Sequence, residues 1–434
     1  MTGMAGRAGN KVLALVLAGG AGGRLDALTE ERAKPAMPFA GVCRLIDFAL
    51  SNCMHSGLSD VWVLQQYQPR ALSEHLANGR PWDLDRTYGG LRVLHPHQGR
   101  GGDEGRDGWY QGNADAIYRS ATEIREFDPD LVLVLSADHL YKLDYRDVIA
   151  AHLDHDADVT MVATRVPLAE AGRFGTLVAD DRGRVTDFAY KPERPESDLV
   201  TTEVFVYNAR VLLNTLDALA AEAGGPGDAE GEESPLKDFG HALVPRLVEG
   251  GRAYAYRFDG YWRDVGTVES YWQAHLDLLA DRPELALDDP DWPILTLGAQ
   301  RLPARIAASA RIEQSLISPG CTVRGRVVCS VLGPGVVVEE GATVRDSVVL
   351  HDTVIGPRAT VARAIVDMQA TVEEGARVGA RGAEDGLAIV GQRARIPAKG
   401  RVPAGGKVMP GATEAGSPRA SRKRTTAQRQ RAAS

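Results

Sequence analysis

Two short segments near the start of the chain combine glycines with positive charge. Residues 17–25 read LAGGAGGRL, and residues 32–36 read RAKPA. A glycine backbone can approach phosphates closely, and its exposed N–H groups bind anions. The lysine is not followed by Ser or Thr as in a P-loop, and no acidic residue completes a dinucleotide fingerprint. We therefore predict a triphosphate site that includes Leu17, Ala18, Gly19, Gly20, Gly22, Gly23, Arg24 and Lys34.

Two aspartates are candidate ligands of Mg²⁺. Asp138 lies in SADHLY, directly after an apolar run, and Asp264 lies in YWRDVGT. Two carboxylates, phosphate oxygens and water can complete an octahedral magnesium shell. The alternative for Asp138 is a turn or helix-capping residue, and we expect the adjacent His139 to be structural.

Lys191, in YKPERP at 190–195, is a candidate for holding a sugar phosphate. An exposed lysine in a turn is the alternative. Transfer at phosphorus needs mainly positioning and charge neutralisation, which a metal ion and cations supply. No Ser/His/Asp or Cys/His constellation stands out, so the residues favour nucleotidyl transfer over nucleophilic catalysis.

Apolar runs that alternate with helical segments are expected to position these residues. The runs begin at 12, 61, 131, 159 and 204, and the helical segments span 45–56, 114–126 and 145–155. Such alternation predicts a Rossmann-like α/β domain with a mostly parallel sheet. Ligands bind such sheets at the carboxyl ends of the strands, where the glycine turn and Asp138 should both lie.

Beyond residue 303 the pattern changes to Val and Ile at intervals of six, in groups that repeat every 17 residues. This spacing predicts a parallel β-helix of hexapeptide repeats, with a β-sandwich as the alternative. We expect an interior that includes Val338, Val344, Ile355, Val361, Val372 and Val378.

The domains are therefore expected at 11–280 (catalytic), 281–303 (linker), 304–410 (β-helix) and 411–434 (disordered basic tail). Within the first, the glycine-rich acidic stretch 224–233 is expected to be a mobile surface loop.

Composition narrows the class of protein further. The 434 residues carry a net charge of −8, which gives no reason to expect nucleic-acid binding by the whole molecule. No apolar run approaches the ~20 residues of a membrane span, and the polar N-terminus does not resemble a secretory signal. Four cysteines without a CxxC pair fit reduced thiols, so we expect a cytoplasmic protein.

Taken in order, these elements resemble the ADP-glucose pyrophosphorylases, also called glucose-1-phosphate adenylyltransferases. The resemblance runs from about residue 11 to about residue 410. It is most specific in four stretches: RAKPAMPFAGVCRLIDFALSNCMHSG, WYQGNADAIY, SADHLYKLDY and YWRDVGTVESYW. The resemblance implies ATP and glucose 1-phosphate as substrates, a role in glycogen synthesis, a left-handed β-helix and a homotetramer.

The resemblance also assigns roles to individual residues. Asp138 and Asp264 would hold Mg²⁺, and Arg24 and Lys34 would act on the triphosphate. The nucleotide site would include Gln98, Gly112 and Asp115. The sugar site would include Tyr110, Gly175, Tyr190, Lys191, Thr201 and Glu203.

Several positions depart from the usual family pattern, among them three in or near the expected sugar site. Tyr190 stands where a glutamate usually precedes Lys-Pro, Glu203 stands where glycine is usual, and Asn113 replaces Ser or Thr. An inward Glu203 could pair with the ammonium of an amino sugar, so glucosamine 1-phosphate is a candidate competing substrate. The contrary expectation has Tyr190 pointing outward and Glu203 in solvent.

Two further readings stay open from the residues. One is a non-catalytic regulatory paralogue, which retention of the cationic and acidic residues disfavours. The other is a bifunctional uridylyl/acetyltransferase, which the different glycine loop and the scarcity of histidine in the repeats disfavour, since the repeats contain only His351.

Overall fold

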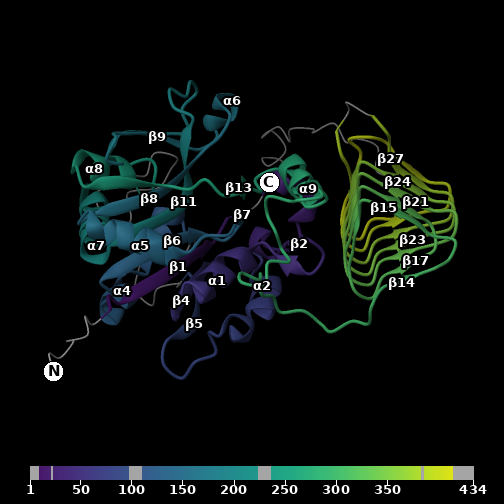
Figure 1. Ribbon diagram of the computed structural model, residues 1–434, viewed down its shortest axis with the longest axis horizontal. Helices are drawn as coiled ribbons and strands as arrows, with labels where there is room; N and C mark the ends of the chain where they lie inside the picture. The colour runs from purple at the N-terminus through teal and green to yellow at the C-terminus, as the bar shows by residue number, and fades with distance from the viewer. Residues whose placement is uncertain (1–8, 21–22, 97–109, 223–235, 383–385, 414–434) are drawn as a thin grey trace, which may run out of the picture.

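The computed structural model describes residues 9–20, 23–96, 110–222, 236–382 and 386–413. The chain divides into an α/β domain and a stack of short parallel strands beside it, as Figure 1 shows. None of the described helices is long and apolar enough to cross a membrane.

A nine-stranded sheet forms the centre of the α/β domain. Its main path runs β10-β9-β11-β6-β1-β4-β5, and β8 joins β11 to β12. Pairing is parallel across β6, β1, β4 and β5, whereas β11 runs antiparallel to both β6 and β8. The sheet is thus mixed, with a parallel centre. Its strands are β1 (Val12–Ala18), β4 (Asp60–Gln65), β5 (Gly90–Leu94), β6 (Leu131–Ser136), β8 (Val159–Arg165), β9 (Gly175–Ala179), β10 (Val185–Tyr190), β11 (Leu199–Asn208) and β12 (Ala253–Arg257).

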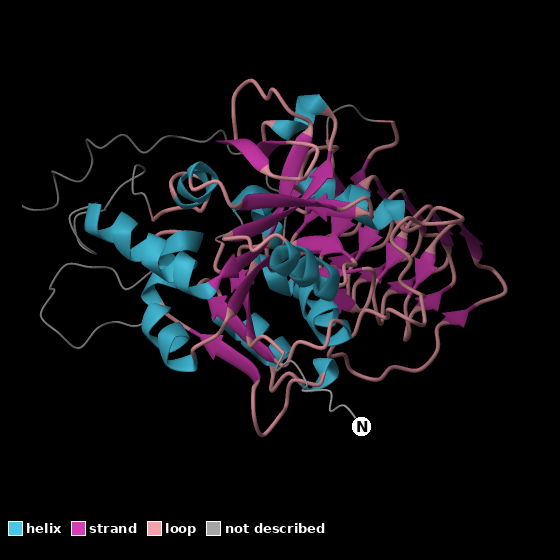
Figure 2. Ribbon diagram, turned by 60° about the vertical axis from the view of Figure 1, so that its left-hand side comes forward, coloured by secondary structure: helices cyan, strands magenta, loops and turns pink. Residues whose placement is uncertain are grey.

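Helices cover both faces of this sheet, which Figure 2 shows in cyan around magenta strands. Successive side chains of β1 point to opposite faces of the sheet. Leu13 and Leu15 pack in the hydrophobic core on one face, and Ala14 and Val16 pack in the core on the other face. This explains why the run 12–18 is apolar throughout, because a strand covered on both faces has no polar side. The helices are α1 (Ile46–His55), α2 (Pro69–Leu76), α3 (Asn113–Arg119), α4 (Ala121–Phe127), α5 (Tyr145–Asp154), α6 (Leu168–Ala171), α7 (Ala209–Glu222), α8 (Leu243–Glu249) and α9 (Val268–Asp277).

Smaller elements complete the α/β domain. Two antiparallel pairs join β2 (Pro38–Phe39) to β3 (Cys43–Arg44) and β7 (His139–Tyr141) to β13 (Trp262–Asp264). The 3-10 turns are η1 (Gly23–Leu28), η2 (Lys34–Ala36) and η3 (Arg80–Trp82). The expectation of one helix over 114–126 was wrong, because the backbone leaves helical geometry at Ser120 between α3 and α4.

Three parallel sheets of six strands each form the second domain, which is a left-handed β-helix of hexapeptide repeats. All six aliphatic residues expected inside it are fully buried. The sheets are β14 (Arg305–Ile306), β17 (Thr322–Val323), β20 (Val337–Val338), β23 (Val354–Ile355), β26 (Thr371–Val372) and β29 (Arg395–Ile396); β15 (Arg311–Glu313), β18 (Arg326–Val328), β21 (Thr343–Arg345), β24 (Thr360–Ala362), β27 (Arg377–Gly379) and β30 (Arg401–Val402); and β16 (Leu316–Ile317), β19 (Val331–Leu332), β22 (Val348–Val349), β25 (Ala364–Val366), β28 (Ala388–Val390) and β31 (Lys407–Val408).

The segment expected to be a linker packs along the α/β domain before it reaches β14. The Leu295 carbonyl accepts a hydrogen bond from the Trp82 indole, and the Trp292 indole donates to Asn52. The acidic stretch 224–233 and most of the basic tail lie outside the described residues.

Candidate active site

A cavity of about 310 Å³ opens beside the carboxyl ends of β1, β4 and β6. It therefore lies at the sheet edge where open α/β sheets bind ligands. Many of the residues expected to form a site line this cavity: Leu17, Ala18, Gly19, Gly20, Arg24, Lys34, Tyr110, Gly112, Asp138, Tyr190, Lys191 and Glu203.

Lys34 connects the two aspartates on one side of the cavity. Its ammonium forms an ion pair with Asp138 and lies 3.6 Å from Oδ1 of Asp264. Burial alone would raise the pKa of Asp138, but Lys34 and His139 outweigh it and hold the pKa well below its usual range. Both carboxylates thus face the ammonium of Lys34 at the edge of the cavity.

A strand pairing explains how two distant aspartates meet. Asp138 follows β6 and precedes β7, and in the antiparallel pairing of β7 with β13 Asp264 is the partner of His139. The pairing of β7 with β13 therefore brings Asp264 next to Asp138, although the two residues are far apart in the sequence. The backbone carbonyl of Asp264 also accepts a 2.6 Å hydrogen bond from Ser270 in α9, which helps to fix the turn.

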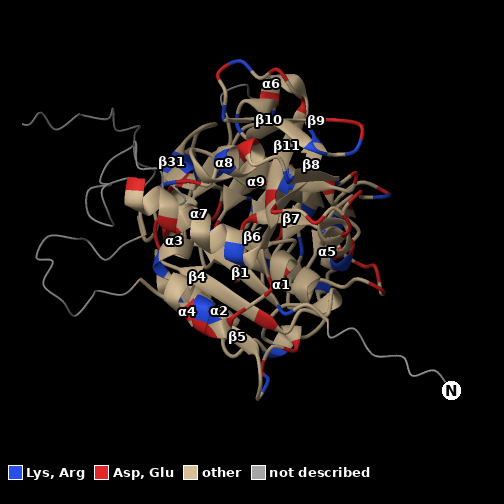
Figure 3. Cartoon of the chain, turned by 90° about the vertical axis from the view of Figure 1, so that its left-hand side faces the viewer, with Lys and Arg blue, Asp and Glu red and all other residues tan. Residues whose placement is uncertain are grey.

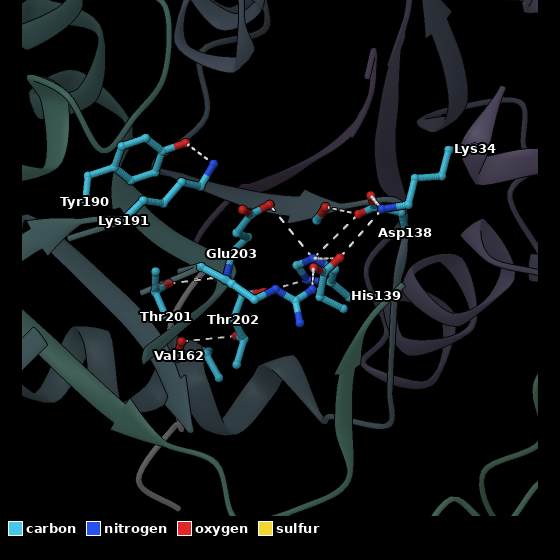
Figure 4. Close-up of polar contacts among 12 residues, drawn as sticks. Lys34, Asp138, His139, Val162, Tyr190, Lys191, Thr201, Thr202 and Glu203 are labelled. Carbon is cyan, nitrogen blue, oxygen red and sulfur yellow. Dashed lines mark hydrogen bonds and ion pairs between the residues drawn. The ribbon is translucent and has the colours of Figure 1, made fainter. Parts of the chain in front are cut away.

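His139 lies among three carboxylates, as Figure 4 shows. Its Nδ1 donates to the Thr202 carbonyl at 2.9 Å, which directs Nε2 toward Asp138, Asp264 and Glu203 at 3.6, 3.7 and 4.0 Å. Burial would lower the pKa of His139, but these carboxylates raise it above its ordinary value. His139 is thus a buried contact between the backbone at Thr202 and the acidic cluster.

Glu203 lies on the cavity wall between Lys191 and His139 (Figure 4). Its backbone has φ +58°, a conformation that favours glycine, at an irregular step in the pairing of β11 with β8. Shielding from solvent raises the pKa of this carboxyl, and the charges of Asp138 and Asp264 raise it further. Glu203 therefore lines the cavity, contrary to the alternative expectation, while its side chain is still 45% exposed.

Tyr190 and Lys191 form the opposite wall. The Tyr190 hydroxyl donates to Asp238 at 3.1 Å and accepts a 2.7 Å hydrogen bond from the Lys191 ammonium. The expectation of an outward Tyr190 is wrong as well, because its side chain lines the cavity.

Several expected residues lie apart from the cavity lining. Asp115 is buried beneath it and accepts from the Gln111 N–H and from Arg119. Gly175 packs against Phe188 and Thr201, where an added Cβ would lie 2.8 Å from the Phe188 ring. Gly23 begins η1, and Asp264 contacts Lys34 from outside the lining. Gly22 and Gln98 lie outside the described residues.

The sequence had not indicated Gln66, Ser136, Asp238 or Phe239, all of which line the cavity. Gln66 follows β4, so the same edge argument that identified Asp138 could have found it. Its side-chain amide bonds the backbone N–H and carbonyl of Tyr110. No periodicity marks Asp238 or Phe239, which follow the acidic stretch.

Charge around the cavity is a local feature. On the face shown in Figure 3, acidic and basic residues are interspersed along the helices and loops. The cavity lining likewise combines three cations, Arg24, Lys34 and Lys191, with the carboxylates of Asp138, Glu203 and Asp238, so an anionic ligand depends on which cation it contacts.

Comparison with protein families agrees with this geometry. A family model described as Nucleotidyl transferase matches residues 13–281, and one described as GlmU-like, C-terminal hexapeptide matches residues 299–393. The fold and the cavity therefore define a nucleotidyltransferase domain followed by a hexapeptide β-helix.

Individual relatives show which family of nucleotidyltransferases the chain resembles most specifically. A glucose-1-phosphate adenylyltransferase of Bacillus thuringiensis (strain Al Hakam) is 43% identical over 366 residues, which are 84% of this chain and 94% of the relative. A protein of the same name from Bacillus anthracis is 42% identical over the same shares. The chain belongs to the glucose-1-phosphate adenylyltransferase family.

Proposed function

We propose that the chain transfers the adenylyl group of ATP to glucose 1-phosphate, giving ADP-glucose and pyrophosphate for glycogen synthesis. The observation that carries this proposal is that one cavity has the glycine turn, Arg24 and Lys34 on one side and Lys191 on the other. The phosphate of the sugar must approach the α-phosphate of the nucleotide, so two anions must share one site. Cations on opposite walls suit that task.

The ATP part of the proposal rests on the glycine turn. Gly19 and Gly20 follow β1 directly at the carboxyl edge of the sheet. Their backbone can approach the triphosphate, and Lys34 supplies charge where the pyrophosphate leaves.

We also propose Mg²⁺ as the cofactor, held by Asp138 and Asp264. The donor set fits, because magnesium is commonly bound by one or two carboxylates together with substrate phosphates. Among the described residues, no group of three or more His, Cys, Asp and Glu forms a metal cage, so substrate phosphates would have to complete the shell. When bound, the ion would neutralise charge on the phosphates, while Lys34 holds the carboxylates together.

The experiment is to incubate the purified chain with ATP, glucose 1-phosphate and Mg²⁺ and to quantify both products. We expect ADP-glucose and pyrophosphate in equal amounts, and strongly reduced formation by Lys34→Met. Failure of the unaltered chain to form ADP-glucose, or full activity of Lys34→Met, would contradict the proposal.

Glucosamine 1-phosphate is a second candidate acceptor, and the placement of Glu203 favours it. A non-glycine residue in the left-handed region costs about 1–2 kcal/mol, yet this position places a carboxylate at the cavity wall. A carboxylate there can pair with a 2-ammonium group, whereas a glucose hydroxyl offers it only a neutral donor.

The kcat/KM values for the two sugar phosphates test this second candidate. We expect the ratio of glucosamine to glucose 1-phosphate to fall in Glu203→Gln, which keeps the shape and removes the charge. An unchanged ratio would show that Glu203 does not select the sugar.

The cytoplasmic location and the homotetramer are further proposals. The four cysteines carry free thiols, which supports a reducing compartment. Light scattering of the purified chain measures the assembly, and a monomer would exclude the tetramer.

A further inference from the structure

The segment 236–241 touches both halves of the cavity. On the nucleotide side, the Phe239 N–H donates to Asn113 Oδ1 at 2.8 Å, and an added Cβ on Gly112 would lie 1.6 Å from the Lys237 carbonyl oxygen. On the sugar side, Asp238 accepts the hydrogen bond of Tyr190. The segment is therefore a bridge between the two walls.

Tyr190 is held by more than its hydroxyl. Its ring lies against the backbone of Gly240, where an added Cβ would be 2.0 Å from the ring, and against the His241 ring at a centroid distance of 4.8 Å. A tyrosine ring has only two side-chain torsions, so these contacts leave its hydroxyl in one place.

That hydroxyl uses both of its hydrogen-bonding capacities. It donates its proton to Asp238 Oδ2 and accepts from the Lys191 ammonium, so the negative charge of Asp238 acts on Lys191 through one oxygen. An ammonium has three donors, so the bond to Tyr190 leaves others for an anionic ligand.

Besides the hydroxyl, the Tyr190 ring contacts the Lys191 ammonium, with 4.5 Å between the nitrogen and the ring centroid, and the Lys191 backbone is fixed separately. Its N–H donates to the Phe174 carbonyl at 3.0 Å, and its φ is +47°. The flexible four-carbon side chain loses considerable rotamer freedom when its ammonium is held in one position. A prepositioned ammonium incurs that loss before the ligand arrives and therefore binds it more tightly.

We infer that Asp238, acting through the hydroxyl of Tyr190, positions the Lys191 ammonium for the phosphate of the sugar substrate. The inference rests on the proposed function, and it makes Asp238 and Tyr190 positioning residues. Because segment 236–241 also contacts Asn113, the same bridge sets the sugar-phosphate cation relative to the nucleotide side.

The test is a double-mutant cycle with Tyr190→Phe, Asp238→Ala and the double variant, read by calorimetric binding of glucose 1-phosphate and by KM. Tyr190→Phe keeps the ring on Gly240 and removes only the hydroxyl. We expect each single variant to weaken binding by about tenfold, because hydrogen bonds to charged groups have effects of this size. The double variant should bind no worse than the weaker single variant, and the KM for ATP should stay within about twofold.

Tyr88→Phe is the matched control, because Tyr88 is 90% exposed. Unchanged binding in Tyr190→Phe, or single effects that multiply in the double variant, would overturn the inference. Failure of the proposed function would look different, since the unaltered chain would then form no ADP-glucose.

Discussion

Lys34, Asp138 and Asp264 are the residues on which the chemistry of the cavity depends most. One ammonium contacts both carboxylates, and Nε2 of His139 lies 3.6 Å from Asp138 and 3.7 Å from Asp264. The two carboxylates therefore have cationic or hydrogen-bonding partners in a partly buried place, where a charge without a partner would be costly.

Replacing either aspartate by asparagine should reduce kcat by two or more orders of magnitude and leave the fold intact. The substitution keeps the shape but removes a charge that stabilises the reacting phosphates, and each ~1.4 kcal/mol of lost stabilisation is a factor of ten. Steady-state kinetics and circular dichroism of Asp138→Asn and Asp264→Asn measure the two effects. Asp181→Asn in an exposed turn is the control, and equal kcat values in all three variants would contradict the assignment.

The sequence predicted some of these residues better than others. Asp138 could be predicted because an apolar run ends just before it, and Glu203 because it replaces an expected glycine. The Tyr190–Asp238 contact could not be predicted, since residues 223–235 intervene and no periodicity links the two. The carboxylate neighbours of His139 could not be predicted, because they depend on the pairing of β7 with β13.

At the scale of elements, Gly112, which directly precedes α3, packs against the backbone of segment 236–241. A Cβ at this position would overlap the Lys237 carbonyl oxygen. Gly112→Ala should therefore separate the two segments, lower the free energy of unfolding by about 1–3 kcal/mol and raise the KM for ATP. Gly298→Ala is the control, because no atom lies within 4 Å of an added Cβ there. Urea unfolding and kinetics measure both variants, and similar values would contradict this account of the glycine.

Helix α9 contains a buried neutral histidine that should make the protein sensitive to acid. His275 Nδ1 donates to the Tyr271 carbonyl, and Nε2 accepts from the Ala40 N–H at 3.3 Å. Burial lowers its pKa to about 4. Because the unfolded histidine has a pKa of about 6.5, the unfolded chain binds a proton first, and stability falls as the pH drops through this window.

His275→Gln should remove this contribution. Between pH 7 and pH 5, the unaltered chain should lose about 2 kcal/mol more unfolding free energy than the variant. Denaturant titrations at both pH values provide the measurement. The buried residues His152 and His351 also have lowered pKa values and affect both proteins alike. Equal losses would show that His275 does not take up the proton.

The elements themselves were predictable where one physical pattern dominated. Continuous apolar runs identified the buried strands, and the interval of six identified the β-helix. The 17-residue register holds from Val337 to Val354 and Thr371, but the next strand of that sheet begins at Arg395 because the coil is longer. The antiparallel direction of β11 was not predictable, since a buried strand is apolar whichever way it runs.

At the scale of the whole molecule, a cluster of buried apolar residues from both domains forms the interface between them. Val348, Leu350 and Ile389 of the β-helix pack with Phe39 and Tyr271 of the α/β domain. Inside this interface Arg32 forms a buried ion pair with Asp367. The β-helix is therefore a support for the segment that contains Lys34, two residues beyond Arg32.

Asp367→Ala should lower the free energy of unfolding by about 3–5 kcal/mol, because it leaves the buried Arg32 guanidinium without its carboxylate. Glu374→Ala is the control, because its pair with Arg358 is exposed and should contribute less than about 1 kcal/mol. Urea unfolding curves of the two variants measure the difference. Equal stabilities would show that the interdomain ion pair does not hold the domains together.

The most direct measurement for the central claim is pyrophosphate release from glucose 1-phosphate with ATP, CTP, GTP, UTP and dTTP, each tested separately. The glycine turn would contact only the triphosphate, which all five nucleotides share. Selection among the nucleotides must therefore come from contacts between the cavity and the nucleobase. We expect ATP to be used at least about tenfold better than any other nucleotide, a preference that needs only ~1.4 kcal/mol. Preference for UTP or dTTP, or no release with ATP, would contradict it.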